Sequence, residues 1–180
     1  PIGVDANGAW PAAVAIATIR RLEEFGIAFA EQPVPPGDAG TMAEVRRATG
    51  VPIVADESVY SAQDAHILAR AGAADAVSIY VGKSGGIASA RRIAAVAQTA
   101  GLGATIGSNL ELGVASAAMI HLALATPGLT IPSDIIGPLY YEEDILAEPL
   151  LLRPGEARAP DRPGLGVELR LAGPAKASYL

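Results

Sequence analysis

Residues 51–82, VPIVADESVYSAQDAHILARAGAADAVSIYVG, contain the pattern that decides the fold. A short apolar run predicts a strand over Pro52–Ser58, and a second run predicts a strand over Ala76–Gly82. Between them an amphipathic segment predicts a helix over Ala62–Ala71, which opens with Ser61 and, three residues later, an acidic residue, a variant of the capping box. This order predicts one β/α unit with two parallel strands.

The same alternation continues in both directions along the chain. Six strands are predicted at steps of roughly 25 residues, which is the size of one unit of a β/α barrel, and a helix is predicted after each of the first five. The further strands are Ile2–Asp5, Ile27–Gln32, Gly103–Asn109 and Leu129–Asp134, and the further helices are Pro11–Phe25, Thr41–Ala48, Ile87–Ala100 and Leu112–Ala125.

Two closures of these units compete, an open doubly wound sheet and a (β/α)8 TIM-type barrel. A polar residue lies at or near the end of every predicted strand, and this favours the barrel because all its strand ends converge on one mouth. Six units fall short of eight, so residues 1–180 are expected to be the C-terminal part of a single, incomplete barrel domain. A tail rich in Pro and Gly, with short strands at Leu150–Arg153 and Val167–Leu171, is expected to wrap it. The strand-end residues are Asp5, Glu31, Asp56, Tyr80, Asn109 and Asp134.

Composition excludes several classes of protein. The 180 residues are 51% hydrophobic and 18% charged, which argues against disorder, and the chain has no Cys for a disulfide scaffold or a thiolate metal site. The net charge of −6 argues against a nucleic-acid partner. Neither a membrane-spanning run nor a signal-peptide pattern is visible, so no membrane partner and a cytoplasmic location are expected.

Asp5, Glu31 and Asp56 close three consecutive predicted strands. Neighbouring strand ends of a barrel lie close together, and three carboxylates at one point cannot all stay ionised without a cation between them. Ligation by oxygen alone suits Mg²⁺ or Mn²⁺. The alternative is that each residue caps the following helix, but three in register favour the metal site.

The local motifs around these residues carry a family resemblance that extends over nearly the whole chain. Taken in order and at barrel spacing, they resemble the enolase superfamily, and most closely its muconate lactonizing enzyme and mandelate racemase groups. The motifs are Val4-Asp5-Ala6-Asn7, Glu31-Gln32-Pro33, Ala55-Asp56-Glu57-Ser58, Gly82-Lys83-Ser84-Gly85-Gly86 and Pro163-Gly164-Leu165-Gly166.

The resemblance implies a metal-dependent enzyme that removes the proton alpha to the carboxylate of a small substrate and forms a metal-stabilised enolate. The expected reaction is most like that of a muconate-type cycloisomerase. An acid-sugar dehydratase or a racemase or epimerase is the alternative, and a non-catalytic binding barrel is the alternative of a different class. Asp5, Glu31 and Asp56 are the implied ligands, with Asn7 supporting the first. The resemblance also implies a homo-oligomer at full length and an N-terminal capping domain that this chain lacks.

The chain departs from the family pattern where a base is expected. The lysine base of lactonizing relatives falls on Tyr80, and an ordinary Tyr is neutral at pH 7, so Tyr80 either donates a proton or hydrogen bond or only packs in the barrel. The superfamily's other base, a Lys-x-Lys pair, is not in this chain. Glu111 matches a polar contact or proton donor of the relatives, and its alternative is an acidic residue in the first turn of a helix.

Three more residues are candidates for binding substrate at the mouth. Asn109 falls near the base position of the racemase-like groups, Asp134 ends the sixth predicted strand, and Lys83 lies in the Gly-rich turn past a strand end. His66 and His121 are predicted to be ordinary helix residues.

Overall fold

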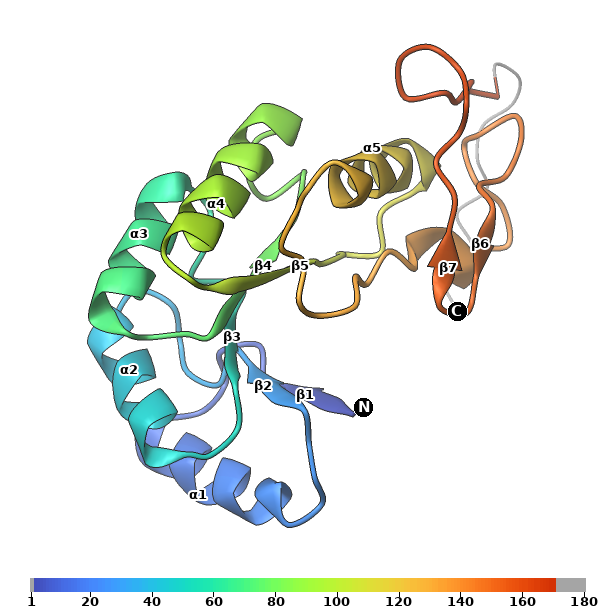
Figure 1. Cartoon of the computed structure of the whole chain (residues 1–180). Coiled ribbons are helices and arrows are strands. Elements are labelled where there is room, and N and C mark those ends of the chain that lie inside the picture. Colours follow the sequence, from blue (N-terminus) through green and yellow to red (C-terminus); the bar gives the residue numbers. More distant parts are fainter. Residues whose placement is uncertain (1, 171–180) are drawn as a thin grey trace.

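The computed structural model describes residues 2–170, and its centre is a sheet of five parallel strands (Figure 1). The spatial order β1-β2-β3-β4-β5 equals the chain order, as in a barrel, whereas a doubly wound sheet reverses direction at a switch point. The barrel-type interpretation is therefore confirmed, for an incomplete barrel. The strands are β1 (Gly3–Asp5), β2 (Phe29–Glu31), β3 (Ile53–Ala55), β4 (Ala76–Ile79) and β5 (Gly103–Ile106).

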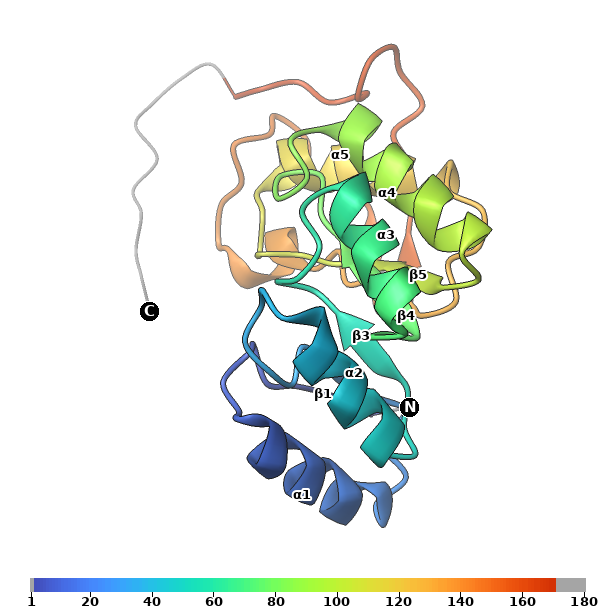
Figure 2. The same cartoon turned by 90° about the vertical axis from the view of Figure 1, so that its left-hand side faces the viewer.

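Helices follow each strand and cover the outer side of the sheet. Figures 1 and 2 show the first four side by side along one side of a curved sheet, whose other side stays open. Their inner faces bury large apolar side chains, among them Ile19, Met42 and Ile93, and each such burial contributes about 1.5–3 kcal/mol. The helices are α1 (Ala12–Glu23), α2 (Ala39–Ala48), α3 (Ala62–Ala71), α4 (Ile87–Thr99) and α5 (Gly113–Leu124).

The capping signals predicted for α3 are present. The Ser61 hydroxyl accepts a hydrogen bond from the Asp64 backbone N–H at 3.2 Å, and the Asp64 carboxylate accepts one from the Ser61 N–H at 2.8 Å. The helix ends at Gly72, whose φ of 60° is left-handed and favours glycine. These local interactions fix where α3 begins and ends. They therefore also fix where the chain leaves β3 and enters β4.

The sixth predicted strand, Leu129–Asp134, is only partly formed. It makes one parallel bridge, between Leu129 and Ala104, and the Asp134 N–H donates to the Ile106 carbonyl at 2.8 Å. Pro132 has no N–H to donate, which interrupts the ladder. The segment still runs beside β5 and carries Asp134 to the same end of the sheet.

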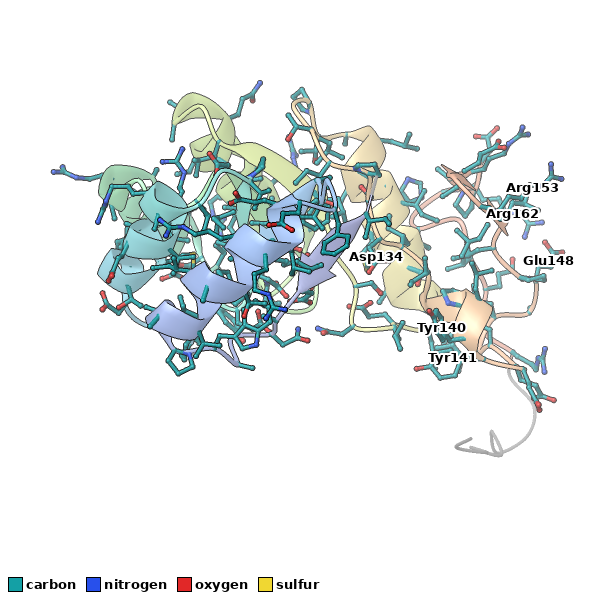
Figure 3. The ribbon with its side chains drawn as sticks, turned by 90° about the horizontal axis from the view of Figure 1, so that it is seen from below. Asp134, Tyr140, Tyr141, Glu148, Arg153 and Arg162 are labelled. Carbon is teal, nitrogen blue, oxygen red and sulfur yellow. The ribbon has the colours of Figure 1, made fainter. Side chains whose placement is uncertain are left out.

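The tail after Asp134 is irregular, as predicted, but its strands differ from the prediction. A short helix, η1 (Gly137–Tyr140), precedes a hairpin of β6 (Leu152–Arg153) and β7 (Glu156–Ala157). The predicted strand at Val167–Leu171 is reduced to one bridge between Leu169 and Leu146, and Leu171 lies outside the described residues. Figure 3 shows Glu148, Arg153 and Arg162 of this tail at the opposite end of the molecule from α1 and α2.

Across residues 2–170, none of the helices combines the length and the apolar character that crossing a bilayer requires.

Candidate metal and substrate site

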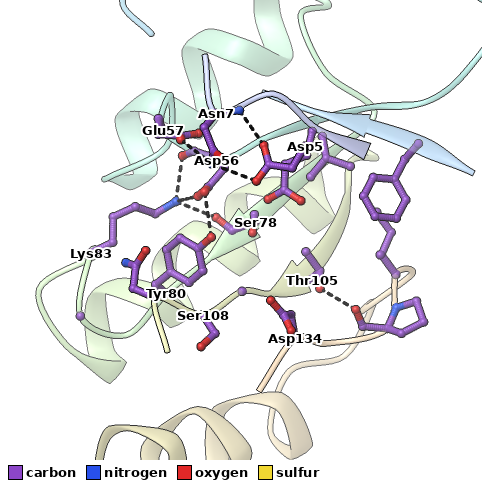
Figure 4. A pocket seen from close by; sticks show the side chains of 18 of the residues that line it. Asp5, Asn7, Asp56, Glu57, Ser78, Tyr80, Lys83, Thr105, Ser108 and Asp134 are labelled. Carbon is purple, nitrogen blue, oxygen red and sulfur yellow. Dashed lines mark hydrogen bonds and ion pairs between the residues drawn. The ribbon is translucent and has the colours of Figure 1, made fainter. Parts of the chain in front are cut away.

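A pocket of about 520 Å³ opens where the strands end (Figure 4). Side chains from β1 through β5 and from the segment Ile131–Asp134 line it. All five strands are parallel, so their carboxyl ends meet at this one edge of the sheet. The pocket therefore gathers residues that lie more than a hundred positions apart in the chain.

Asp5, at the end of β1, is held by Asn7. The Asn7 backbone N–H donates to one carboxylate oxygen at 2.8 Å, and its side-chain amide donates to the other at 2.9 Å. The same amide also donates to Glu57 at 3.2 Å, which ties the ends of β1 and β3 together. Asn7 adopts a left-handed φ of 45°, a conformation that Asn tolerates better than most residues.

Asp56, just after β3, is positioned by the fully buried side chain of Gln32. The Gln32 amide oxygen accepts from the backbone N–H groups of Asp56 and Ser58, at 2.9 and 3.2 Å. Its amide nitrogen donates to the Val34 carbonyl and the Ser58 hydroxyl, both at 2.8 Å. One side chain from the end of β2 thus fixes the loop that carries Asp56.

The carboxylate of Asp56 is occupied on both oxygens. The Tyr80 hydroxyl donates to one at 2.8 Å, and the Lys83 ammonium forms an ion pair with the other. Lys83 also donates to the backbone carbonyls of Asp56 and Ser78, at 2.8 and 3.1 Å. Its backbone lies past β4, as predicted, but its side chain turns back into the pocket and is only 6% exposed.

Glu31, at the end of β2, faces the same pocket between the other two acids. Burial, followed by the negative charges of Asp5 and Asp56, raises the pKa of Glu31 to about 7. Desolvation also raises the pKa of Asp5, although the Asn7 N–H opposes the shift. The pocket is therefore short of positive charge.

The three carboxylates share this pocket but do not close on one point. Within residues 2–170, no set of three or more acidic or histidine side chains is near enough to hold a metal ion together. Each of two carboxylates has its own partners: Lys83 and Tyr80 contact Asp56, and Asn7 contacts Asp5. The donor set nevertheless fits Mg²⁺ or Mn²⁺, because all its atoms are oxygens and their mutual repulsion favours a cation.

Tyr80 packs in the barrel and also contacts the site. Its side chain is 6% exposed, and its ring lies over Gly107 at the end of β5, where any side chain would collide with it. Burial and the hydrogen bond to Asp56 raise the pKa of Tyr80 above its ordinary value. The phenol is therefore protonated at neutral pH and acts as a hydrogen-bond donor.

The mouth beside β5 holds the remaining predicted site residues. Asn109 and Asp134 line the pocket, and desolvation followed by the charge of Glu111 raises the pKa of Asp134. Glu111 lies behind this lining, where its carboxylate accepts from the Ser108 hydroxyl at 2.8 Å and the Asn109 N–H at 2.9 Å. Glu111 precedes α5 rather than lying in its first turn.

His66 and His121 lie in α3 and α5, as predicted, and neither lines the pocket.

Several pocket residues were not predicted from the sequence. Ser78 and Thr105 lie inside buried strands and point into the pocket, and a polar residue within an apolar strand was the available signal. Gln32 belongs to a quoted motif, but nothing in the motif indicates that its side chain crosses to the next strand. The contact of Lys83 with Asp56 depends on the path of the turn after β4, which spacing does not specify.

The fold and the pocket together define a barrel domain with acidic strand ends, and comparison with known proteins identifies its class. The profile of the enolase C-terminal domain-like family matches residues 1–172, and the chain belongs to this family. It lies within the enolase superfamily, in the mandelate racemase and muconate lactonizing enzyme group.

Among individual proteins, the chain is similar to muconate cycloisomerase 1 of Rhodococcus opacus, with 37% identity over 170 residues, 94% of this chain and 46% of that one. It is 36% identical to a chloromuconate cycloisomerase of Cupriavidus necator, over 93% of this chain and 45% of that one. The crystal structure of muconate lactonizing enzyme from Pseudomonas fluorescens complexed with muconolactone superimposes with a TM-score of 0.90 at 38% identity, covering 93% of this chain and 45% of that one. The chain thus spans a little under half the length of these relatives.

Proposed function

We propose that the protein is a divalent-metal-dependent enzyme of the muconate cycloisomerase type, acting on a small carboxylate. The supporting observation is that Asp5, Glu31 and Asp56 share one pocket in which burial and mutual repulsion raise the proton affinity of Glu31. The similarity to muconate and chloromuconate cycloisomerases supports this reaction over an acid-sugar dehydratase or a racemase. We further expect a homo-oligomer in the cytoplasm for the full-length protein.

Asp5, Glu31 and Asp56 would hold Mg²⁺ or Mn²⁺. The bound ion would supply positive charge to offset the negative charge that develops on the substrate carboxylate. Asn7 orients Asp5 through two hydrogen bonds, and Gln32 orients the backbone that carries Asp56. These contacts fix the side chain of Asp5 and the loop that carries Asp56 before the ion binds.

In this proposal two residues of the chain, Tyr80 and Glu111, donate a hydrogen bond or a proton during the reaction. Tyr80 donates a hydrogen bond from its protonated phenol, and Glu111 is the candidate proton donor at the β5 mouth. Three lining residues of the pocket are the proposed substrate contacts: Lys83, Asn109 and Asp134. In this proposal the main base lies in a Lys-x-Lys pair outside this chain.

The test is metal binding and turnover of Asp56→Asn in the full-length protein. Isothermal titration with Mn²⁺ should show affinity weakened by at least about a hundredfold, because the Asn amide carries no charge. Conversion of muconate, followed by the loss of its ultraviolet absorbance, should fall with it. Asp161→Asn, on the exposed tail, is the matched control.

Unchanged Mn²⁺ affinity in Asp56→Asn would remove Asp56 from the ligand set. Intact metal binding in the unaltered protein without turnover of muconates, acid sugars or amino-acid derivatives would favour the non-catalytic binding barrel.

A further inference from the structure

Lys83 is a cation placed inside an acidic pocket. Its side chain is 6% exposed, and its ammonium forms an ion pair with the Asp56 carboxylate (Figure 4). Two backbone carbonyls, of Asp56 and Ser78, accept its other hydrogen bonds at 2.8 and 3.1 Å. All three donors of the ammonium are therefore in use, and the Tyr80 ring lies 4.2 Å from it.

This arrangement puts a full positive charge at a carboxylate that the proposed function assigns to a divalent ion. An ammonium and a metal ion that share one carboxylate repel each other strongly in a poorly solvated pocket. The hydrogen bond from Tyr80 goes to the second oxygen of Asp56, so each carboxylate oxygen already has a partner in the pocket. A metal ion that binds Asp56 is therefore opposed by the positive charge of Lys83 for as long as the ion pair stays formed.

We propose that Lys83 is an internal counter-ion of the Asp56 carboxylate, and that a divalent cation binds the pocket only by displacing it. The inference rests on the proposed function, since it concerns the same three carboxylates. It adds that Lys83 lowers metal affinity and neutralises the charge of Asp56 when no metal is bound. The site thus exchanges one cation for another, and removing Lys83 should leave the divalent ion without a competitor.

The experiment compares Mn²⁺ binding by isothermal titration in the full-length protein and in Lys83→Met. Methionine keeps most of the side-chain volume and removes the charge, so the affinity for Mn²⁺ should rise by about tenfold or more. Lys83→Gln keeps hydrogen-bond donors for the two carbonyls and should give the same direction if Lys83→Met is poorly folded. Arg91→Met, on the exposed surface of α4, is the matched control for loss of one positive charge and should leave affinity unchanged.

The outcomes separate this inference from the proposed function. Unchanged or weaker Mn²⁺ binding in folded Lys83→Met and Lys83→Gln, with normal binding in the unaltered protein, would overturn the inference and leave the metal site standing. Absence of Mn²⁺ binding in all variants would overturn both. An equal gain of affinity in Arg91→Met would also overturn the inference, because it would indicate a general effect of net charge.

Discussion

Tyr80 occupies the strand end where the family match expects a lysine, and its surroundings suit a different task. Burial and the hydrogen bond to Asp56 raise its pKa, so the phenol does not ionise near neutral pH. Its ring covers Gly107, so the residue also fills the space between β4 and β5. The packing and the hydrogen bond are separable, because only the second needs the hydroxyl.

Replacing Tyr80 with Phe tests this separation. The ring packing should remain, whereas one hydrogen bond to a carboxylate is lost, which is worth about 1.5–3 kcal/mol. Because the proposed role of the hydroxyl lies in the transition state, turnover by the full-length protein should fall roughly tenfold to a hundredfold. Mn²⁺ affinity should change much less, because the Asp56 carboxylate is retained. Steady-state kinetics and isothermal titration measure the two effects. Unaltered turnover would mean that Tyr80 only packs.

The raised pKa of Glu31 should make the stability of the fold depend on pH when no metal is bound. Its pKa is raised by burial to about 7 in the folded chain, compared with an ordinary value of 4.5. The folded state binds the Glu31 proton more tightly than the unfolded state does, so protonation of Glu31 adds to the free energy of unfolding. This contribution is complete below about pH 4.5 and is lost as the pH rises through about 7. Urea unfolding in a chelator should show a loss of about 1–3 kcal/mol over this range.

Glu31→Gln is the matching variant, because glutamine has nearly the same shape and does not titrate. Its stability should vary less with pH over the same interval. A slope equal to that of the unaltered protein would assign the pH dependence to other groups.

At the scale of elements, the site depends on contacts between neighbouring β/α units. Gln32 follows β2 and makes four hydrogen bonds, three of which reach the loop after β3. Its backbone has a left-handed φ of 31°, so the chain accepts local strain to direct this side chain across to the next strand. Loops that are joined in this way hold their acidic residues at fixed positions.

Gln32→Leu should therefore destabilise the fold. Leucine fits the buried space but leaves buried N–H and C=O groups without partners, at a cost of about 2–4 kcal/mol. Urea unfolding measures the change, and Gln63→Leu on the exposed surface of α3 is the control, expected to stay within about 0.5 kcal/mol. Equal stability of the two variants would show that the Gln32 contacts are not stabilising.

At the scale of the whole molecule, the described sheet has an unpaired edge at β1. This strand pairs with β2 on one side only, and Ile2 beside it is 72% exposed. An open parallel edge presents unpaired N–H and C=O groups that another chain can pair with. Large apolar side chains in the tail, including Tyr140 and Leu151, are also exposed (Figure 3 labels Tyr140).

The 180-residue chain produced by itself should consequently self-associate and be less stable than the full-length protein. Size-exclusion chromatography with light scattering measures the association. Ile2→Lys places a charge at the open edge and should reduce it. A monomer at high concentration, with stability equal to the full-length protein, would contradict this prediction.

The sequence by itself determined the alternation of strands and helices, the parallel barrel-type order and the N-terminal cap of α3. Each depends on local signals: apolar periodicity and the Ser61–Asp64 capping box. The spacing of Asp5, Glu31 and Asp56 likewise put three acids at one end of the sheet, since parallel strands end together.

Only the tertiary structure decided what those acids contact. Lys83 turns back onto Asp56, and Gln32 crosses to the next loop. These outcomes depend on the paths of turns and on competition for hydrogen bonds between segments far apart in the chain. The spacing of residues along the sequence does not specify the paths of turns or the choice of hydrogen-bond partners, because packing in three dimensions determines both.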